Sequence, residues 1–285
     1  MKSSHKHSRQ KHTRNTTPKR ENPRRQPRGK TPRPPERSSG ERLNRYMAQC
    51  GLCSRREADR WIAAGRVTIN GNTVTELGTQ VAPSDRVEVD GKEVHPAARH
   101  TYLIYHKPKG LLCSRRDDRG RPLIYDELEL PPTVQSVGRL DMDSEGVLLL
   151  TDDGRLTQAL TRPQAKLPRQ YRVRIAGHPE LETLQALREG GIDIGRDELS
   201  DPWAVTVDSE SGGHTWLTIV IHRGRWREVR RTLEARGHPV RRLIRTKFGP
   251  LKLGDQPPRT TREIKPGELR QLKRAAGIDT PQQEK

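Results

Sequence analysis

GRLDMDSEGVLLLTDDG, residues 138–154, places an acidic loop directly before an apolar strand. Asp141, Asp143 and Glu145 lie in the loop, and the four apolar residues 147–150 follow it. A carboxylate beside such packing has its ionised form disfavoured unless a cation lies close to it. The stretch therefore predicts a buried strand, a loop that holds a carboxylate, and a basic partner from elsewhere in the chain.

The acidic residues of this loop also have the spacing of a calcium-binding EF-hand. Positions one, three, five, six and twelve of such a loop would be Asp141, Asp143, Glu145, Gly146 and Asp152. An EF-hand needs a helix on both sides, and position nine here is Leu149 instead of an oxygen ligand. Because residues 148–150 have the pattern of a strand, we favour a loop and a strand over a calcium site.

Further short strands surround this stretch, with few helices between them. Strand patterns occur at 102–105, 147–150, 171–175, 204–207 and 216–221, and helical patterns at 156–160, 181–187 and 228–235. Several strands follow one another directly, which favours antiparallel pairing. We expect residues 101–276 to form one α+β domain with a central, largely antiparallel mixed sheet and flanking helices.

A smaller α+β module is expected at residues 41–94. Ser54 can cap its second helix, Glu57 can complete a capping box, and Gly65 ends the helix. Asn70-Gly71 and Asp90-Gly91 are hairpin turns between short alternating strands. Basic side chains crowd the helical half and give one positive face: Arg42, Arg45, Arg55, Arg56, Arg60 and Arg66.

The net charge of +19 makes a polyanion the first partner to consider. Residues 1–40 carry 13 Lys and Arg against 2 Glu and contain no Val, Ile, Leu or aromatic residue. Such a segment cannot bury enough apolar surface to fold, so we expect a disordered basic arm that either aids solubility or attracts phosphate. Residues 95–100 are expected to be a linker, and residues 277–285 a tail.

The composition argues against several other classes of protein. No stretch approaches the length of a membrane span, and the N-terminus lacks the apolar run of a secretory signal, so a cytoplasmic protein is expected. Cys50 and Cys53 form a lone C-x-x-C, and Cys113 stands apart. Without further ligands at suitable spacing, a packing role is favoured over a metal or redox role.

The small module resembles the S-four RNA-binding domain. The resemblance rests on Arg42-Leu-Asn-Arg45, on Ser54-Arg-Arg-Glu-Ala58 and on Gly65-Arg-Val-Thr-Ile-Asn-Gly71. It implies that the two-helix face docks on structured RNA through phosphate and shape contacts. RNA contacts are thus expected from Arg42, Arg45, Arg55, Arg56 and Arg66.

Four motifs of the larger domain, in the order expected, resemble the pseudouridine synthases of the RsuA and RluB group. They are Lys107-Pro-Lys-Gly110, Gly138-Arg-Leu-Asp141, Pro168-Arg-Gln-Tyr171 and Gly224-Arg-Trp-Arg-Glu-Val-Arg-Arg231. Arg242-Leu-Ile-Arg245 follows near the end of the domain. From Arg42 to about Leu272 the chain looks most like the RluB branch, which acts on large-subunit ribosomal RNA.

This resemblance implies roles for individual residues. Asp141 would be the essential carboxylate, Tyr171 the platform for the uracil, and Arg230 the bidentate partner of Asp141. Because Val229 and Leu233 mark the buried face of their helix, Arg230 and Arg231 should diverge, and only one need enter the site. Contacts to the substrate are expected from Lys107, Arg139, Leu140 and Arg225.

The expected function is the isomerisation of a uridine to pseudouridine in ribosomal RNA, without a metal or another cofactor, by a monomer. The alternative is a non-catalytic RNA-binding or ribosome-assembly protein on the same scaffold. The presence of Asp141, Tyr171 and Arg230 together favours the enzyme. A DNA-binding protein would fit the charge, but no recognition-helix or zinc-finger pattern supports it.

Overall fold

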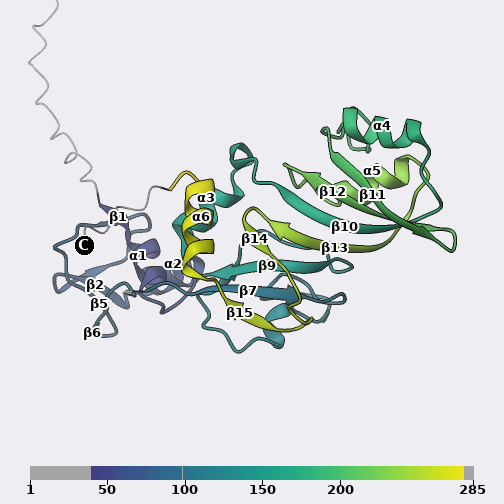
Figure 1. The fold of residues 1–285 in the computed structure, drawn as a ribbon. Helices are drawn as coiled ribbons and strands as arrows, with labels where there is room; N and C mark the ends of the chain where they lie inside the picture. Colours follow the sequence, from purple (N-terminus) through teal and green to yellow (C-terminus); the bar gives the residue numbers. More distant parts are fainter. Residues whose placement is uncertain (1–39, 98, 279–285) are drawn as a thin grey trace, which may run out of the picture. The chain divides into compact units, whose positions relative to one another are not determined.

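The computed structural model describes residues 40–97 and 99–278 (Figure 1). The expected basic arm lies outside the described residues except for its last residue, and so does all but the start of the expected tail. The described residues form a small module of short helices and strands at 41–94 and a larger α+β domain from Tyr102 onward.

The small module has the two helices and the hairpins that its sequence predicts. Its elements are β1 (Glu41–Arg42), α1 (Leu43–Gln49), α2 (Arg55–Ala63), β2 (Val67–Ile69), β3 (Asn72–Val74), β4 (Gln80–Val81), β5 (Val87–Val89) and β6 (Lys92–Glu93). The strands pair as β1-β4 and as β3-β2-β5-β6. Apolar residues of both helices, Leu43, Met47, Ala58 and Ile62, pack with the valines of the strands into one buried cluster.

Local signals fixed the ends of these elements. The Ser54 hydroxyl accepts a hydrogen bond from the Glu57 backbone N–H at 3.2 Å and caps α2. The other half of the predicted capping box is replaced by an ion pair, because the Glu57 carboxylate lies 2.6 Å from Arg60. Asn70 and Asp90, each followed by glycine, adopt positive φ in tight hairpin turns, as predicted.

The two cysteines of the C-x-x-C pair are free thiols in this module. Burial raises the pKa of Cys50 to about 12 and that of Cys53 to about 11. A thiol is a nucleophile or a metal ligand only as the thiolate, so both are poorly reactive near neutral pH. Cys53 belongs to the buried apolar cluster, which agrees with the packing role favoured for it.

One mixed sheet of nine strands forms the centre of the larger domain (Figure 1). Its strands are β7 (Tyr102–Lys107), β8 (Gln135–Ser136), β9 (Glu145–Thr151), β10 (Arg169–Ala176), β11 (Ala204–Ser211), β12 (His214–Ile221), β13 (Val240–Phe248), β14 (Leu251–Lys252) and β15 (Thr261–Glu263). The order is β11-β12-β10-β13-β9-β7-β15, with β14 beside β13 and β8 beside β9. Only β13 and β9 run parallel, so the expected largely antiparallel sheet is confirmed.

Helices cover both faces of this sheet. They are α3 (Gly154–Thr161), α4 (Leu181–Glu189), α5 (Glu228–Ala235) and α6 (Pro266–Ala275), with short 3₁₀ turns at Ile124–Asp126 and Pro163–Ala165. Leu148 and Leu150 of β9 point into a cluster shared with α4 and α5. Val147 and Leu149 point to the opposite face, which α3 and α6 cover. Two apolar cores therefore lie on opposite faces of β9.

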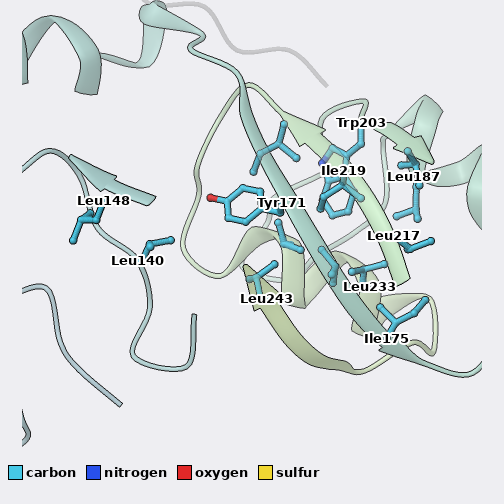
Figure 2. Packing of buried hydrophobic residues seen from close by; sticks show 14 of the residues in the cluster. Leu140, Leu148, Tyr171, Ile175, Leu187, Trp203, Leu217, Ile219, Leu233 and Leu243 are labelled. Atoms are coloured by element: carbon cyan, nitrogen blue, oxygen red, sulfur yellow. The ribbon is translucent and has the colours of Figure 1, made fainter. Parts of the chain in front are cut away.

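The larger core carries the tyrosine of the third motif (Figure 2). Tyr171, Val173 and Ile175 of β10 alternate with outward-pointing residues and pack on Leu217 and Ile219 of β12. The hydroxyl of Tyr171 extends from this packing toward the side where Leu140 lies (Figure 2). The core thus fixes the tyrosine ring with its hydroxyl on the side of the acidic loop.

Strand β13 and helix α6 were not predicted from the sequence. The inward positions of β13 include Arg245, which is only 3% exposed, so the apolar alternation of an ordinary strand is interrupted there. Its neighbour in the parallel pair is Gly146, whose φ is +114°. A Cβ at position 146 would lie 2.2 Å from the carbonyl oxygen of Arg245, so only glycine permits the contact between β9 and β13.

None of the helices in the described part of the chain is both long enough and apolar enough to cross a membrane.

Candidate active site

A cavity of about 620 Å³ opens where the acidic loop, strands β10 and β13 and the segment before α5 meet. Asp141 and Tyr171, which lie 30 positions apart in the sequence, both line it. Arginines outnumber acidic residues in the lining of the cavity. The acidic residues are Asp117, Asp141 and Glu228, and the seven arginines are Arg116, Arg121, Arg139, Arg169, Arg225, Arg227 and Arg245. Such a lining suits a polyanionic substrate that places an uncharged base in the interior.

Buried Lys107 fixes the backbone of the acidic loop. Its ammonium group donates to the carbonyl oxygens of Pro108 at 2.9 Å, Asp141 at 3.0 Å and Ser144 at 2.9 Å. The side chain is 0% exposed and all three N–H donors are used. The expected contact between Lys107 and RNA is therefore wrong, because the ammonium group faces the protein interior and has no free donor.

Further hydrogen bonds hold the same loop at both ends. The Cys113 thiol lies 3.4 Å from both the backbone nitrogen and the carbonyl oxygen of Leu140, in hydrogen-bond geometry with each. The Gly110 N–H donates to the Met142 carbonyl at 2.8 Å, and the Ser144 N–H donates to the Asp141 carbonyl at 3.0 Å. The backbone that carries Asp141 is thus fixed before any substrate arrives, as a preorganised site requires.

Asp143 is the acid that the basic motif neutralises. Arg227 donates two parallel hydrogen bonds to its carboxylate, at 3.0 and 2.9 Å. Arg230 donates to the Asp143 carbonyl at 2.8 Å, and its Nε lies 3.2 Å from the carboxylate, outside hydrogen-bond geometry. Burial opposes ionisation here, but the Arg227 hydrogen bonds and both cations hold the pKa of Asp143 below its usual value.

The bidentate partner predicted for Asp141 is therefore wrong in detail. Arg230 pairs with Asp143, and the fork-like contact comes from Arg227, to which the sequence assigned no role. Arg227 has a left-handed backbone, φ +49°, at the start of α5, which turns its side chain toward the loop. The expected divergence of Arg230 and Arg231 is confirmed, because Arg231 bonds to Ile194, Gly195 and Glu198 instead.

Asp141 is the loop carboxylate that remains available to a ligand. Arg242 makes two hydrogen bonds to Glu145, at 3.0 and 2.9 Å, just as Arg227 does to Asp143. No ion pair is formed by Asp141 within the described residues. Burial raises the pKa of Asp141 and Asp143 adds to this effect, whereas the charges of Arg227, Arg230 and Lys107 oppose it.

The remaining residues predicted at the site are distributed around the cavity. Arg139, Leu140 and Arg225 all line it. Arg139 is exposed, Leu140 is 6% exposed, and Arg225 forms ion pairs with Asp201 and Glu228, each at 3.2 Å. Arg169, the cation before the tyrosine, donates to the carbonyls of Leu167 and His222 at the cavity wall.

The arginines predicted to contact RNA in the small module differ in their surroundings. Arg42, Arg55 and Arg56 are exposed and form no ion pair with another described residue. Arg45 lies 2.7 Å from Glu41, and Arg66 pairs with Asp90 and stacks on Trp61 at 4.5 Å. The first three are therefore the ones free to meet a phosphate.

Replacement of Lys107 by Met should separate a positioning role from an RNA contact. Loss of the ammonium group leaves three loop carbonyls without their donor, so Asp141 shifts and kcat falls about 100-fold. The dissociation constant for RNA and its salt dependence should stay within twofold of wild type. Single-turnover kinetics and filter binding measure the two quantities.

Lys109→Met is the matched control, because Lys109 is exposed and its only ion pair with a described residue is a 3.6 Å contact to Glu145. It should change kcat by less than about threefold. A Lys107→Met variant with normal kcat and weakened RNA binding would contradict the positioning role.

Comparison with known proteins agrees with this geometry. The model of the RNA pseudouridylate synthase family matches residues 101–235, and that of the S4 domain matches residues 41–87. An uncharacterised RNA pseudouridine synthase of Aquifex aeolicus is 40% identical over 240 residues, which span 83% of this chain and 95% of that protein. The ribosomal large subunit pseudouridine synthase B of Bacillus subtilis is 34% identical over 238 residues, 83% of this chain and 97% of that protein.

A solved structure leads to the same family. The crystal structure of a pseudouridylate synthase superposes with a TM-score of 0.59 at 28% identity and covers 81% of this chain and 99% of that one. The chain belongs to the RNA pseudouridylate synthase family and carries an N-terminal S4 domain. It is an RNA-modifying isomerase, and the resemblance to the RsuA and RluB group is confirmed.

Proposed function

We propose that this enzyme converts a uridine of large-subunit ribosomal RNA to pseudouridine, with Asp141 as its catalytic carboxylate. The observation that carries the proposal is that the Asp141 carboxylate forms no ion pair with any residue that the structure describes. Its two acidic neighbours are each held by a pair of arginine hydrogen bonds, whereas Asp141 faces an arginine-lined cavity beside Tyr171. The RNA class is supported by two relatives named ribosomal large subunit pseudouridine synthase B.

The reaction sets requirements that these residues fit. The N-glycosidic bond breaks, the uracil turns, and C5 replaces N1 as the atom bonded to the ribose. C5 loses its proton and N1 gains one, so the product is an isomer of the substrate. No electron is gained or lost, so the overall change needs no redox partner. An ionised carboxylate must face the nucleotide, and the uracil must be held while it is detached.

Asp141 and Tyr171 supply these two functions in the proposal. The fixed loop presents the Asp141 carboxylate to the ribose and base. Partial burial raises the pKa of Asp141, and the charges of Arg227, Arg230 and Lys107 oppose this effect and favour the ionised form. The Tyr171 ring, packed in the main core and 8% exposed, offers a flat apolar wall for the uracil. The target nucleotide must leave its stack to enter the cavity, which favours an unpaired loop of structured RNA.

The small module and the cavity rim supply affinity in this scheme. The exposed arginines of α2 and the N-terminal end of the module contact phosphates, while Arg139 and Arg225 lie near the entering nucleotide. Phosphate contacts position an RNA without reading its sequence. We therefore assign selection of the uridine to the shape of the RNA loop and to the cavity.

The non-catalytic alternative is disfavoured by the same geometry. A protein that only bound RNA would not need a partly buried carboxylate that lacks an ion pair with any described residue, since burial of that charge costs free energy without aiding phosphate binding. Lys107 and Cys113 nevertheless hold its backbone in place. Such fixed positioning of a partly buried carboxylate is expected of a reacting group.

Release of tritium from ribosomal RNA labelled at uracil C5 tests the proposal directly. Wild-type protein should release label from large-subunit RNA and not from small-subunit RNA, and mapping of the product locates the uridine. Absence of release from naked RNA and from assembly intermediates alike would refute the enzymatic proposal. Release from small-subunit RNA alone would refute the choice of subunit.

The acid limb of the pH profile should depend on Arg227. Among the charges that oppose the raised pKa of Asp141, that of Arg227 acts most strongly, and it also neutralises Asp143. Arg227→Gln removes both effects, so the Asp141 pKa rises further. Because only the ionised form reacts, the pH at which kcat is half-maximal on the acid side should move upward.

Arg241→Gln serves as the control for that shift, since Arg241 is exposed on β13 and forms no ion pair with a described residue. Single-turnover rates measured across the acid range give both profiles. An unchanged acid limb in Arg227→Gln would show that Asp141 does not titrate in the rate-limiting complex.

A further inference from the structure

Trp226 is an exposed aromatic residue at the wall of the cavity. It is 52% exposed, and it is the only aromatic residue among the exposed large apolar side chains of the described residues. It lies between Arg225 and Arg227, and all three line the cavity that also holds Asp141. Burial of an indole ring is normally favourable, so a solvent-exposed ring at the cavity wall indicates a binding role.

A cation is stacked on this ring. The guanidinium carbon of Arg196 lies 3.9 Å from the centroid of the Trp226 ring, and that of Arg231 lies 5.6 Å from it. Both distances fall within the range of cation–π attraction. The arginine on the ring leaves more than half of the residue's surface exposed, so the stack does not close the site.

The stack is held by a rigid support. Arg231 donates to the carbonyls of Ile194 at 2.7 Å and Gly195 at 2.6 Å, which fixes the loop that carries Arg196. The same guanidinium donates to the Trp226 carbonyl at 3.1 Å and to the Glu198 carboxylate at 2.7 Å. Arg231, whose side chain is only 12% exposed, thus positions both the Trp226 ring and the Arg196 cation, as a preformed binding surface requires.

The chemistry of this surface fits a nucleobase with its phosphate. A flat ring accepts the face of any base. Arg225, Arg227 and Arg231 are each paired with an acid, whereas Arg196 is exposed, forms no ion pair with a described residue, and can attract the phosphate that accompanies the base. A uridine that enters the cavity keeps its covalent neighbours at the rim. Trp226 is part of that rim and is joined directly to two arginines of the lining.

We propose that Trp226 stacks on the unpaired nucleotide adjacent to the target uridine and so contributes to the choice of RNA. The inference rests on the RNA-modifying activity and deepens it by assigning a flanking-base site. A purine should be preferred over a pyrimidine, because its larger ring system gives more stacking area. A protein side chain is the alternative occupant of this surface, and RNA binding that does not depend on Trp226 would favour it.

Binding of a short uridine-containing RNA loop with 2-aminopurine next to the uridine tests the contact without depending on catalysis. Stacking on Trp226 should quench the fluorescence of the wild-type complex. Trp226→Ala should restore the fluorescence and weaken binding about 10-fold, whereas Trp226→Phe should retain most of both effects. Leu199→Ala is the matched control, because Leu199 is 57% exposed and does not line the cavity.

A double-mutant cycle that combines Trp226→Ala with an abasic nucleotide beside the uridine then locates the contact. When the base beside the uridine is removed, Trp226→Ala should weaken binding by less than twofold, since the partner is already gone. Equal weakening of intact and abasic RNA, or no weakening of either, would overturn the proposal. Tritium release by the wild-type protein from the same intact RNA reports the enzymatic function separately. Release together with RNA binding that does not depend on Trp226 would refute the flanking-base site alone, and Trp226-dependent binding without release would refute the enzymatic function alone.

Discussion

Asp141→Asn should abolish tritium release, with a loss of about 1,000-fold or more, and leave RNA binding within twofold of wild type. The amide keeps the size of the side chain but cannot supply the negative charge that the reaction needs. Since Asp141 forms no ion pair within the described residues and lies partly buried, its replacement breaks no salt bridge. Filter binding and single-turnover release measured on the same preparation test both halves of the expectation.

The same variant should also be as stable as wild type or more stable. Burial of an unpaired carboxylate costs free energy that a neutral amide does not, a cost that reacting groups often impose on a fold. Asp143→Asn is the matched control two residues away. It removes the negative charge that Arg227 and Arg230 neutralise and one of the two oxygen acceptors of Arg227, so its melting temperature should fall while some activity remains.

The two carboxylates therefore have opposite expected phenotypes. Full activity in Asp141→Asn would exclude it as the catalytic residue. If Asp141→Asn were destabilised as strongly as Asp143→Asn, the contrast drawn between a free and a paired carboxylate would be wrong. Thermal melts followed by circular dichroism separate these outcomes from loss of chemistry.

Gly146→Ala should cause the largest loss of stability of any change considered, about 3 kcal/mol or more. Its added methyl group would lie 2.2 Å from the Arg245 carbonyl oxygen, in backbone that cannot yield without separating β9 from β13. The positive φ of +114° adds strain for any L side chain. Because β9 follows the Asp141 loop directly, activity should fall with stability.

Gly237→Ala isolates the cost of the backbone angle from that of the contact. Gly237 also has a positive φ, +78°, but no atom lies within 4 Å of an added Cβ. It should lose about 1 kcal/mol. Urea unfolding of both variants measures the difference, and equal losses would contradict the close approach of the two strands.

Much of the fold was predictable because its signals are local. Alternation over a few residues marks β10 and β12, a serine three residues before a glutamate begins α2, and glycine after Asn70 and Asp90 makes the hairpins. Strand β13 was not predicted, because a buried arginine takes the place of an apolar residue on its inner face. Local patterns cannot show that such a charge will be accommodated by tertiary contacts.

The candidate site was likewise predictable only in part. Its ordered motifs were enough to single out Asp141 and Tyr171, and both line the cavity. They did not reveal that Lys107 is buried beneath the loop or that Arg227 holds Asp143. An exposed and a buried lysine have the same signature in a short basic motif, so the sequence could not separate an RNA contact from a support.

The sequence alone thus predicted most of the long strands, the hairpin turns and the candidate carboxylate, because each of these signals depends on neighbours a few residues away. The tertiary structure decided which charges meet. Asp143 and Arg227 are separated by 84 positions, and their pairing depends on the left-handed turn before α5 and on the parallel contact of β9 with β13. By neutralising the neighbours of Asp141 and leaving it without an ion pair among the described residues, those long-range contacts turn one acid of a charged loop into the candidate reactive group.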